Sequence, residues 1–186
     1  MSHAPRIKPL DPATVEGKAK EMLDGIQAKL GAVPNIFKTF AHSPAVFEVY
    51  LGQSAALNKS SLSPALREQI ALTVAGINSC DYCASAHTVI GRKSGVPEDE
   101  LPAALEGKSK DKHAQAALTF ASRILETNGN VSDGEVKAVR DAGFNDAAIL
   151  EIIATVTFNI FTNYINHIAG TEIDFPMVEA KKKKAA

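Results

Sequence analysis

The stretch from Ala147 to about Ala169 constrains the fold most, because it is long and strongly apolar. Asn145 is suited to cap a helix beginning there, and a helix of this length could cross a bilayer. Polar side chains interrupt the stretch, however, at Glu151, Asn159, Asn163, Asn166 and His167. We therefore predict a helix of the protein core or of a subunit interface rather than a membrane span.

The other segments also carry apolar residues at helical spacing, and none shows the alternation expected of a half-buried strand. Several have terminal signals: Ser63 and Pro64 suit a helix start, Ser132 and Glu135 can form a capping box, and Gly95 suits a left-handed C-terminus. We predict an all-α chain, with further helical segments at 14–30, 36–41, 45–57, 64–77, 80–94, 97–105, 111–128 and 132–142.

The length of 186 residues fits one domain. Residues 1–13 contain three prolines and are predicted to form an irregular N-terminal arm, residues 14–178 the helical domain, and residues 179–186 a flexible lysine-rich tail. The 20 basic and 21 acidic residues nearly balance, so no nucleic-acid or membrane partner is expected. No secretory signal is recognisable at the N-terminus, and we expect a cytoplasmic protein.

The only two cysteines, Cys80 and Cys83, are three residues apart, and His87 follows four residues later. On a helix the three would share one face, at a spacing that a disulfide can bridge. Unpaired N–H groups and the dipole at a helix start lower a thiol pKa, and His87 can exchange the proton. We predict a redox pair with Cys83 as the nucleophile and Cys80, expected to be more exposed, as its resolving partner. The spacing alone leaves the reverse assignment open.

Two further residues are candidates for this site. Glu68 precedes the predicted helix break at Asn78 by about the distance at which His87 follows it. If the two helices fold back on each other, the Glu68 carboxylate can orient the imidazole of His87 and raise its basicity. Tyr82 is more readily a packing residue, although its hydroxyl could donate a hydrogen bond in the site.

The order E-x11-C-x2-C-x3-H of Glu68, Cys80, Cys83 and His87 resembles the signature of the AhpD-like alkylhydroperoxidases, within the carboxymuconolactone decarboxylase superfamily. Residues 33–37 (VPNIF) and 41–44 (AHSP) are similar to the segment before this motif in peroxidase-related members. The resemblance implies an AhpD-like helical fold with an N-terminal helical extension, a homo-oligomer (dimer, trimer or hexamer), and thiol peroxidase activity.

The resemblance also implies a role for each residue. The second cysteine, Cys83, reacts with peroxide as the nucleophile, the first cysteine, Cys80, resolves the product, and Glu68 and His87 relay the proton. Tyr82 stands where alkylhydroperoxidase D itself has a histidine, so the relay is either shorter here or Tyr82 only donates a hydrogen bond. Superfamily members that decarboxylate a lactone generally lack the cysteine pair.

We therefore predict a thiol-dependent peroxidase that takes a hydroperoxide and an external dithiol protein or small thiol, without cofactor or metal. Several alternatives stay open: a buried structural pair, a zinc site on Cys80, Cys83 and His87 with no obvious fourth ligand, a general disulfide reductase, a redox-sensing oligomer, and lactone decarboxylation. Asn159, Asn163 and His167 recur every four residues and could line the site or an interface, or be satisfied within the fold.

Overall fold

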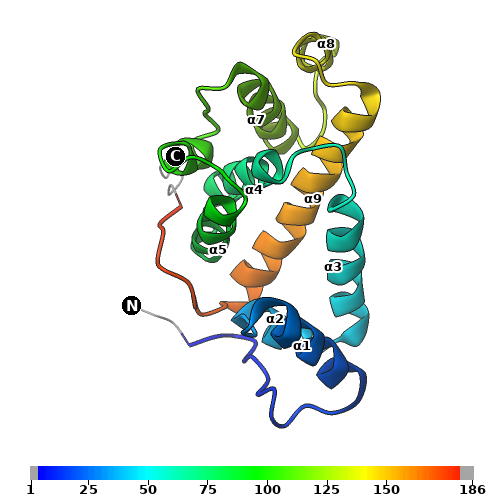
Figure 1. Ribbon diagram of the computed structural model, residues 1–186, viewed down its shortest axis with the longest axis vertical. Coiled ribbons are helices and arrows are strands. Elements are labelled where there is room, and N and C mark those ends of the chain that lie inside the picture. Colours follow the sequence, from blue (N-terminus) through cyan, green and yellow to red (C-terminus); the bar gives the residue numbers. More distant parts are fainter. Residues whose placement is uncertain (1–3, 181–186) are drawn as a thin grey trace.

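The computed structural model describes residues 4–180, and every regular element within them is a helix, as predicted. The helices are α1 (Gly17–Leu30), α2 (Asn35–Phe40), α3 (Pro44–Leu57), α4 (Pro64–Asn78), α5 (Asp81–Lys93), α6 (Glu100–Leu105), α7 (Lys112–Glu126), α8 (Asp133–Asp141) and α9 (Asp146–Ala169). Helix α9 runs through the molecule between α3 on one side and α4 and α5 on the other, while α1 and α2 lie together at one end (Figure 1).

Polar side chains define where most helices begin. Ser63 Oγ accepts a hydrogen bond from Leu66 N at the start of α4, and Asn145 Oδ1 accepts one from Ala148 N at the start of α9. The predicted capping box at the start of α8 is also present. These caps satisfy N–H groups that have no partner within their own helix, so the helix starts follow from local sequence.

Two predicted helix starts are too early. Helix α1 begins at Gly17 rather than Thr14, because Asp11 holds the preceding residues in a turn: its Oδ1 accepts from Ala13 N and its carbonyl accepts from Thr14 N. Helix α6 begins at Glu100, and residues 97–99 form a turn before it.

The long apolar helix α9 is a core element, as predicted. By length and composition it is the described helix that could cross a membrane. However, Ile152 and Val156 are fully buried within the same core as Ile70 and Leu72 of α4 and Leu118 of α7. Another part of its surface remains exposed. Helix α9 therefore joins α3, α4, α5 and α7 into one core.

Both irregular ends of the described chain pack against helices. Residues 4–13 of the N-terminal arm form no helix, and the Arg6 and Ile7 amides donate to the Ala169 carbonyl at the end of α9. The segment after α9 follows α5, where Ala180 N donates to Asp81 Oδ1 at 2.8 Å. Contacts thus continue two residues beyond the predicted domain end at 178. The remainder of the predicted tail, residues 181–186, lies outside the described residues.

Gly76 allows α4 to approach the end of α6 closely. A Cβ atom at this position would lie 2.0 Å from the Leu105 carbonyl oxygen, which is far too short for a non-bonded contact. One turn earlier, Thr73 Oγ1 donates to the Ala104 carbonyl at 2.8 Å. Backbone atoms line both sides of this contact, so no flexible side chain can move away to make room.

We expect Gly76→Ala to lower the free energy of unfolding by about 1–3 kcal/mol, because the added methyl group forces the two helices apart. Gly25→Ala is the matched control, since a Cβ at Gly25 of α1 would meet no atom within 4 Å. That control should be neutral or stabilising by roughly 0.5–1 kcal/mol through helix propensity. Urea denaturation monitored by circular dichroism measures both changes, and equal effects of the two substitutions would contradict the close-approach argument.

Candidate active site

The predicted redox motif lies at the turn between α4 and α5. Ser79 adopts a left-handed backbone conformation (φ 57°) that ends α4, and Cys80 is the extended N-cap residue of α5. The Cys80 sulfur accepts a hydrogen bond from Cys83 N at 3.4 Å, in the manner of an N-capping side chain. Cys83 is thereby held in the first turn of α5.

Both cysteines are free thiols and both are buried, with 1% of Cys80 and 3% of Cys83 exposed. The prediction that Cys80 is the more exposed residue is wrong, because this helix start lies within the continuous hydrophobic core rather than at the surface. The more open part of the site is formed by His87 and Glu68, whose side chains are 20% and 17% exposed.

The predicted contact between Glu68 and His87 is present. The two helices form a hairpin, and His87 Nδ1 lies 2.7 Å from Glu68 Oε2. Burial alone would lower the pKa of His87. The Glu68 charge, its hydrogen bond and the negative charge on Cys83 outweigh burial and raise that pKa above its usual value. A protonated imidazole is therefore favoured, with one nitrogen bound to Glu68 and the other available for proton transfer.

The two thiols have opposite acidities. A hydrogen bond from Cys80 is the largest influence on Cys83; together with the positive charge of His87 and the side chains of Asn166 and Asn163, it outweighs burial and lowers the pKa of Cys83 to about 7. The pKa of Cys80 is raised far above its usual range by that same hydrogen bond, by burial and by the Cys83 charge. Cys83 is the thiolate of the pair and Cys80 is its hydrogen-bond donor.

Helix α9 contributes a residue that the sequence analysis did not assign to the site. Asn166 Nδ2 donates to Cys83 Sγ at 3.2 Å. Asn163 is fully buried, and its Oδ1 accepts from Asn78 Nδ2 at 3.0 Å. Asn159 instead bonds within its own helix, to the Thr155 carbonyl. A signal was available, because asparagines at 159, 163 and 166 share one face of an otherwise apolar helix.

His167, which continued the predicted four-residue spacing, is exposed rather than part of this face.

Tyr82 is bonded to another helix rather than to either sulfur atom. Its hydroxyl accepts a hydrogen bond from Ile36 N at 3.2 Å, and its ring packs edge-on against Phe175 at 5.7 Å between ring centroids. Burial is the main reason that the pKa of Tyr82 is raised far above its usual range. The side chain therefore links α5 to α2 and to the segment after α9, which agrees with the packing role favoured by the sequence.

Tyr50 of α3 is a second residue that the sequence did not assign to the site. Its ring packs against Phe37, Phe40 and Phe158, each at 5.2 Å between centroids. Burial, followed by the negative charges of Glu68 and Cys83, raises the pKa of Tyr50 to about 12. The hydroxyl thus stays protonated near the two acidic groups, at the edge of an aromatic cluster.

No group of three or more histidine, cysteine, aspartate or glutamate side chains among residues 4–180 is arranged to hold a metal ion. Two of the three candidate zinc ligands already have hydrogen-bond partners. His87 Nδ1 is bonded to Glu68, and the Cys83 sulfur accepts a hydrogen bond from Asn166. The geometry therefore lends no support to that alternative.

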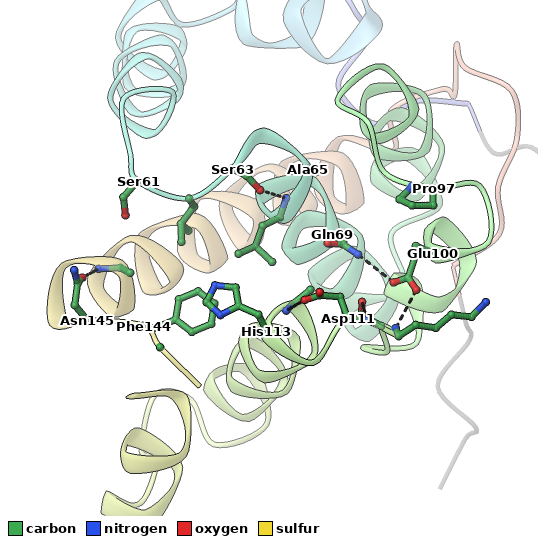
Figure 2. Close-up of a pocket in the computed structure, with 17 residues that line it drawn as sticks. Ser61, Ser63, Ala65, Gln69, Pro97, Glu100, Asp111, His113, Phe144 and Asn145 are labelled. Carbon is green, nitrogen blue, oxygen red and sulfur yellow. Dashed lines mark hydrogen bonds between the residues drawn. The ribbon is translucent and has the colours of Figure 1, made fainter. Parts of the chain in front are cut away.

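A separate cavity of about 680 Å³ lies between the starts of α4, α7 and α9 (Figure 2). Gln69, the residue after Glu68, lines it and donates to Glu100 Oε2 at 3.3 Å, and the rings of His113 and Phe144 stack at 4.0 Å beside them. None of the predicted site residues lines this cavity, so it is distinct from the thiol site.

Residues 44–126 match the sequence pattern of the carboxymuconolactone decarboxylase family, a segment that contains the cysteine pair, Glu68 and His87. Among curated proteins, none matches the sequence significantly.

Three solved structures share the fold over nearly the whole chain. An uncharacterized peroxidase-related protein from Silicibacter sp. TM1040 is 24% identical with a TM-score of 0.81, covering 92% of this chain and 94% of its own. An uncharacterized peroxidase-related protein with an alkylhydroperoxidase AhpD core, from Ralstonia eutropha JMP134, is 26% identical with the same TM-score and coverage. The debrominase Bmp8, in complex with 2,3,4-tribromopyrrole, is 20% identical with a TM-score of 0.77 and covers 94% of both chains.

The fold and the buried cysteine pair beside a glutamate and a histidine define an AhpD-like helical protein. Residues 44–126 carry the carboxymuconolactone decarboxylase family pattern, and the chain as a whole shares the AhpD-like helical fold of the peroxidase-related structures.

The opposite acidities of the two thiols predict a titration with one step near neutral pH. With a pKa of about 7, Cys83 is about half thiolate at pH 7, against about 3% for an ordinary cysteine. Ultraviolet absorbance of the thiolate should therefore fall as the pH drops through 7, and Cys80 should add no second step at neutral pH. In Cys83→Ser the step near pH 7 should disappear; its persistence would assign the thiolate to Cys80.

Proposed function

We propose that the protein is a thiol-dependent hydroperoxide reductase. The observation that carries the proposal is the environment of Cys83, whose sulfur is favoured as a thiolate by the Cys80 thiol, the His87 imidazolium and the Asn166 amide. A thiolate is the form of cysteine that attacks peroxides, and His87 beside it can supply the proton that the leaving oxygen needs.

In the first step the Cys83 thiolate attacks one oxygen of the hydroperoxide. The S–O bond forms as the O–O bond breaks, so the sulfur is oxidised and the peroxide is reduced. The departing alkoxide or hydroxide takes a proton from His87 and leaves as alcohol or water. Glu68 supports this transfer, because its carboxylate keeps the imidazole protonated and oriented through the 2.7 Å contact.

In the second step the Cys80 sulfur attacks the sulfur of the Cys83 sulfenic acid. The S–S bond forms, the S–O bond breaks, and the hydroxyl group leaves as water with the Cys80 proton. Cys80 is placed for this step by its position as the N-cap of α5, beside Cys83. Disulfide formation also limits further oxidation of Cys83.

An external dithiol protein or small thiol then returns the pair to the reduced state. Because both sulfur atoms are buried, we propose that the reductant reaches them after local opening of the segment after α9, which is bound to the first turn of α5 through Ala180 and Asp81. Reduction is then the step most sensitive to the dynamics of that segment.

We also propose that the protein is a homo-oligomer. Helix α9 exposes three large side chains: 66% of Leu150, 55% of Tyr164 and 63% of Ile168. An apolar surface of this kind on a core helix is typical of a protein–protein contact.

Peroxide consumption with a dithiol donor tests the reaction. Cys83→Ser should abolish turnover, because the attacking sulfur is lost. Cys80→Ser should lose turnover but still accept one oxygen atom per chain, since only the resolving thiol is absent. Stopped-flow kinetics and intact mass spectrometry measure the two outcomes. Undiminished turnover in Cys83→Ser would contradict the proposal, and reduction of insulin disulfides without peroxide consumption would favour a general disulfide reductase.

Analytical ultracentrifugation tests the oligomer. The wild-type chain should sediment as an oligomer, and the double substitution of Leu150 and Ile168 by lysine should shift it to the monomer, because charge opposes burial of this surface. Met177→Lys changes an equally exposed side chain outside α9 and should leave the oligomer intact. A monomeric wild-type protein at micromolar concentration would refute this part of the proposal.

A further inference from the structure

Two buried polar atoms beside Cys83 have no hydrogen-bond partner among the described residues: Asn163 Nδ2 and Asn166 Oδ1. Their side chains are otherwise engaged, because Asn163 Oδ1 accepts from Asn78 and Asn166 Nδ2 donates to the Cys83 sulfur. Asn163 is fully buried and Asn166 is 4% exposed. Buried polar groups are nearly always paired in folded proteins, so one free donor and one free acceptor at the same place require an explanation.

The two atoms belong to side chains on the face of α9 that meets the reactive sulfur through Asn166. Asn163 and Asn166 are three residues apart on α9 and therefore share one of its faces. Asn166 Nδ2 lies 3.2 Å from the Cys83 sulfur. The side chain of Asn163 also lowers the pKa of Cys83, although its Nδ2 does not meet the geometry of a hydrogen bond to any described residue. Asn159 lies on the same face but differs from these two residues, because its Nδ2 donates to the Thr155 carbonyl.

A sulfenic acid matches this pair of atoms. The oxygen of an S–O–H group accepts a hydrogen bond through its lone pairs and donates one through its proton. The Cys83 thiol has no such oxygen before reaction. A site that binds the sulfenic oxygen would therefore leave one donor and one acceptor unused in the reduced protein, which agrees with the observed arrangement.

We propose that the Asn163 N–H and the Asn166 carbonyl form a receptacle for the oxygen atom that Cys83 takes from its peroxide. This inference rests on the proposed peroxidase function and assigns two further catalytic residues to it. Asn163 donates to the sulfenic oxygen, and Asn166 accepts the sulfenic proton. Asn166 also donates to the sulfur before reaction, so it acts on both the thiolate and its product.

The receptacle affects two steps. During attack, the Asn163 N–H donates to the oxygen that is being transferred and holds it in line with the sulfur, while negative charge develops on the departing oxygen. After attack, the bond to Asn166 keeps the sulfenic acid protonated. The neutral acid is a weaker nucleophile than its anion and therefore reacts more slowly with a second peroxide. When Cys80 attacks, the S–O bond breaks, and Asn163 stabilises the departing hydroxyl until it leaves as water with the Cys80 proton.

The test uses Cys80→Ser, in which the sulfenic acid cannot be resolved. Asn163→Leu and Asn166→Leu remove the amides while keeping the number and branching of the side-chain heavy atoms. Two matched controls separate this role from packing. Asn159→Leu removes a buried asparagine from the same helix, and Asn78→Ala removes the partner of Asn163 Oδ1 but leaves Asn163 Nδ2 in place. Dimedone trapping and intact mass spectrometry after addition of hydrogen peroxide report the lifetimes of the sulfenic acid and its conversion to sulfinic acid.

We expect the sulfenic acid lifetime in excess peroxide to fall about tenfold or more in Asn163→Leu and Asn166→Leu. Asn166→Leu should also raise the pKa of Cys83, whereas Asn159→Leu and Asn78→Ala should keep the parent lifetime. If a leucine variant fails to fold, Asn163→Asp replaces the donor by an acceptor of the same shape and should shorten the lifetime likewise.

The possible failures are distinct. Equal lifetimes in the Asn163 variants and in Asn159→Leu would overturn the receptacle while leaving the peroxidase function intact. If Cys80→Ser with both asparagines present acquires no oxygen from peroxide, the proposed function itself fails.

Discussion

The hydrogen bond between Glu68 and His87 is the contact on which the chemistry of this protein depends. Burial disfavours a charged imidazole and lowers the pKa of His87, and the Glu68 carboxylate is the main group that opposes it. With the carboxylate 2.7 Å away, the imidazolium is stable and its charge helps to stabilise the Cys83 thiolate. The contact also joins α4 to α5. The same interaction therefore stabilises the helix hairpin and sets the charge of His87 in the site.

The thiolate itself results from several opposing effects. Burial raises the pKa of Cys83, and a buried cysteine without partners would be an inert thiol. Three different elements overcome this: the cap residue Cys80 at the turn, His87 one turn along α5, and Asn166 from α9. The same burial that makes the thiolate costly excludes water, which strengthens each of these interactions.

Local sequence was sufficient to predict the parts of the structure that depend on neighbouring residues. The caps at Ser63 and Asn145 could be predicted because a capping side chain bonds an amide three residues away. The spacing of Glu68 and His87 about one helix break permitted their contact, which also needs α4 and α5 to fold back on each other. The exposure of Cys80 was wrongly predicted, because the packing of the core around the start of α5 leaves no mark in the motif itself.

By itself the sequence determined that the chain is helical and that Cys80, Cys83 and His87 share one helix face, since these properties depend on residues within one or two turns. Only the tertiary structure decided that Asn166, 83 positions from Cys83, donates to its sulfur, and that Tyr82 is directed to α2 instead. These contacts depend on how α9 and α2 are rotated and packed against α5. That rotation is set by the whole core, and no local spacing specifies it.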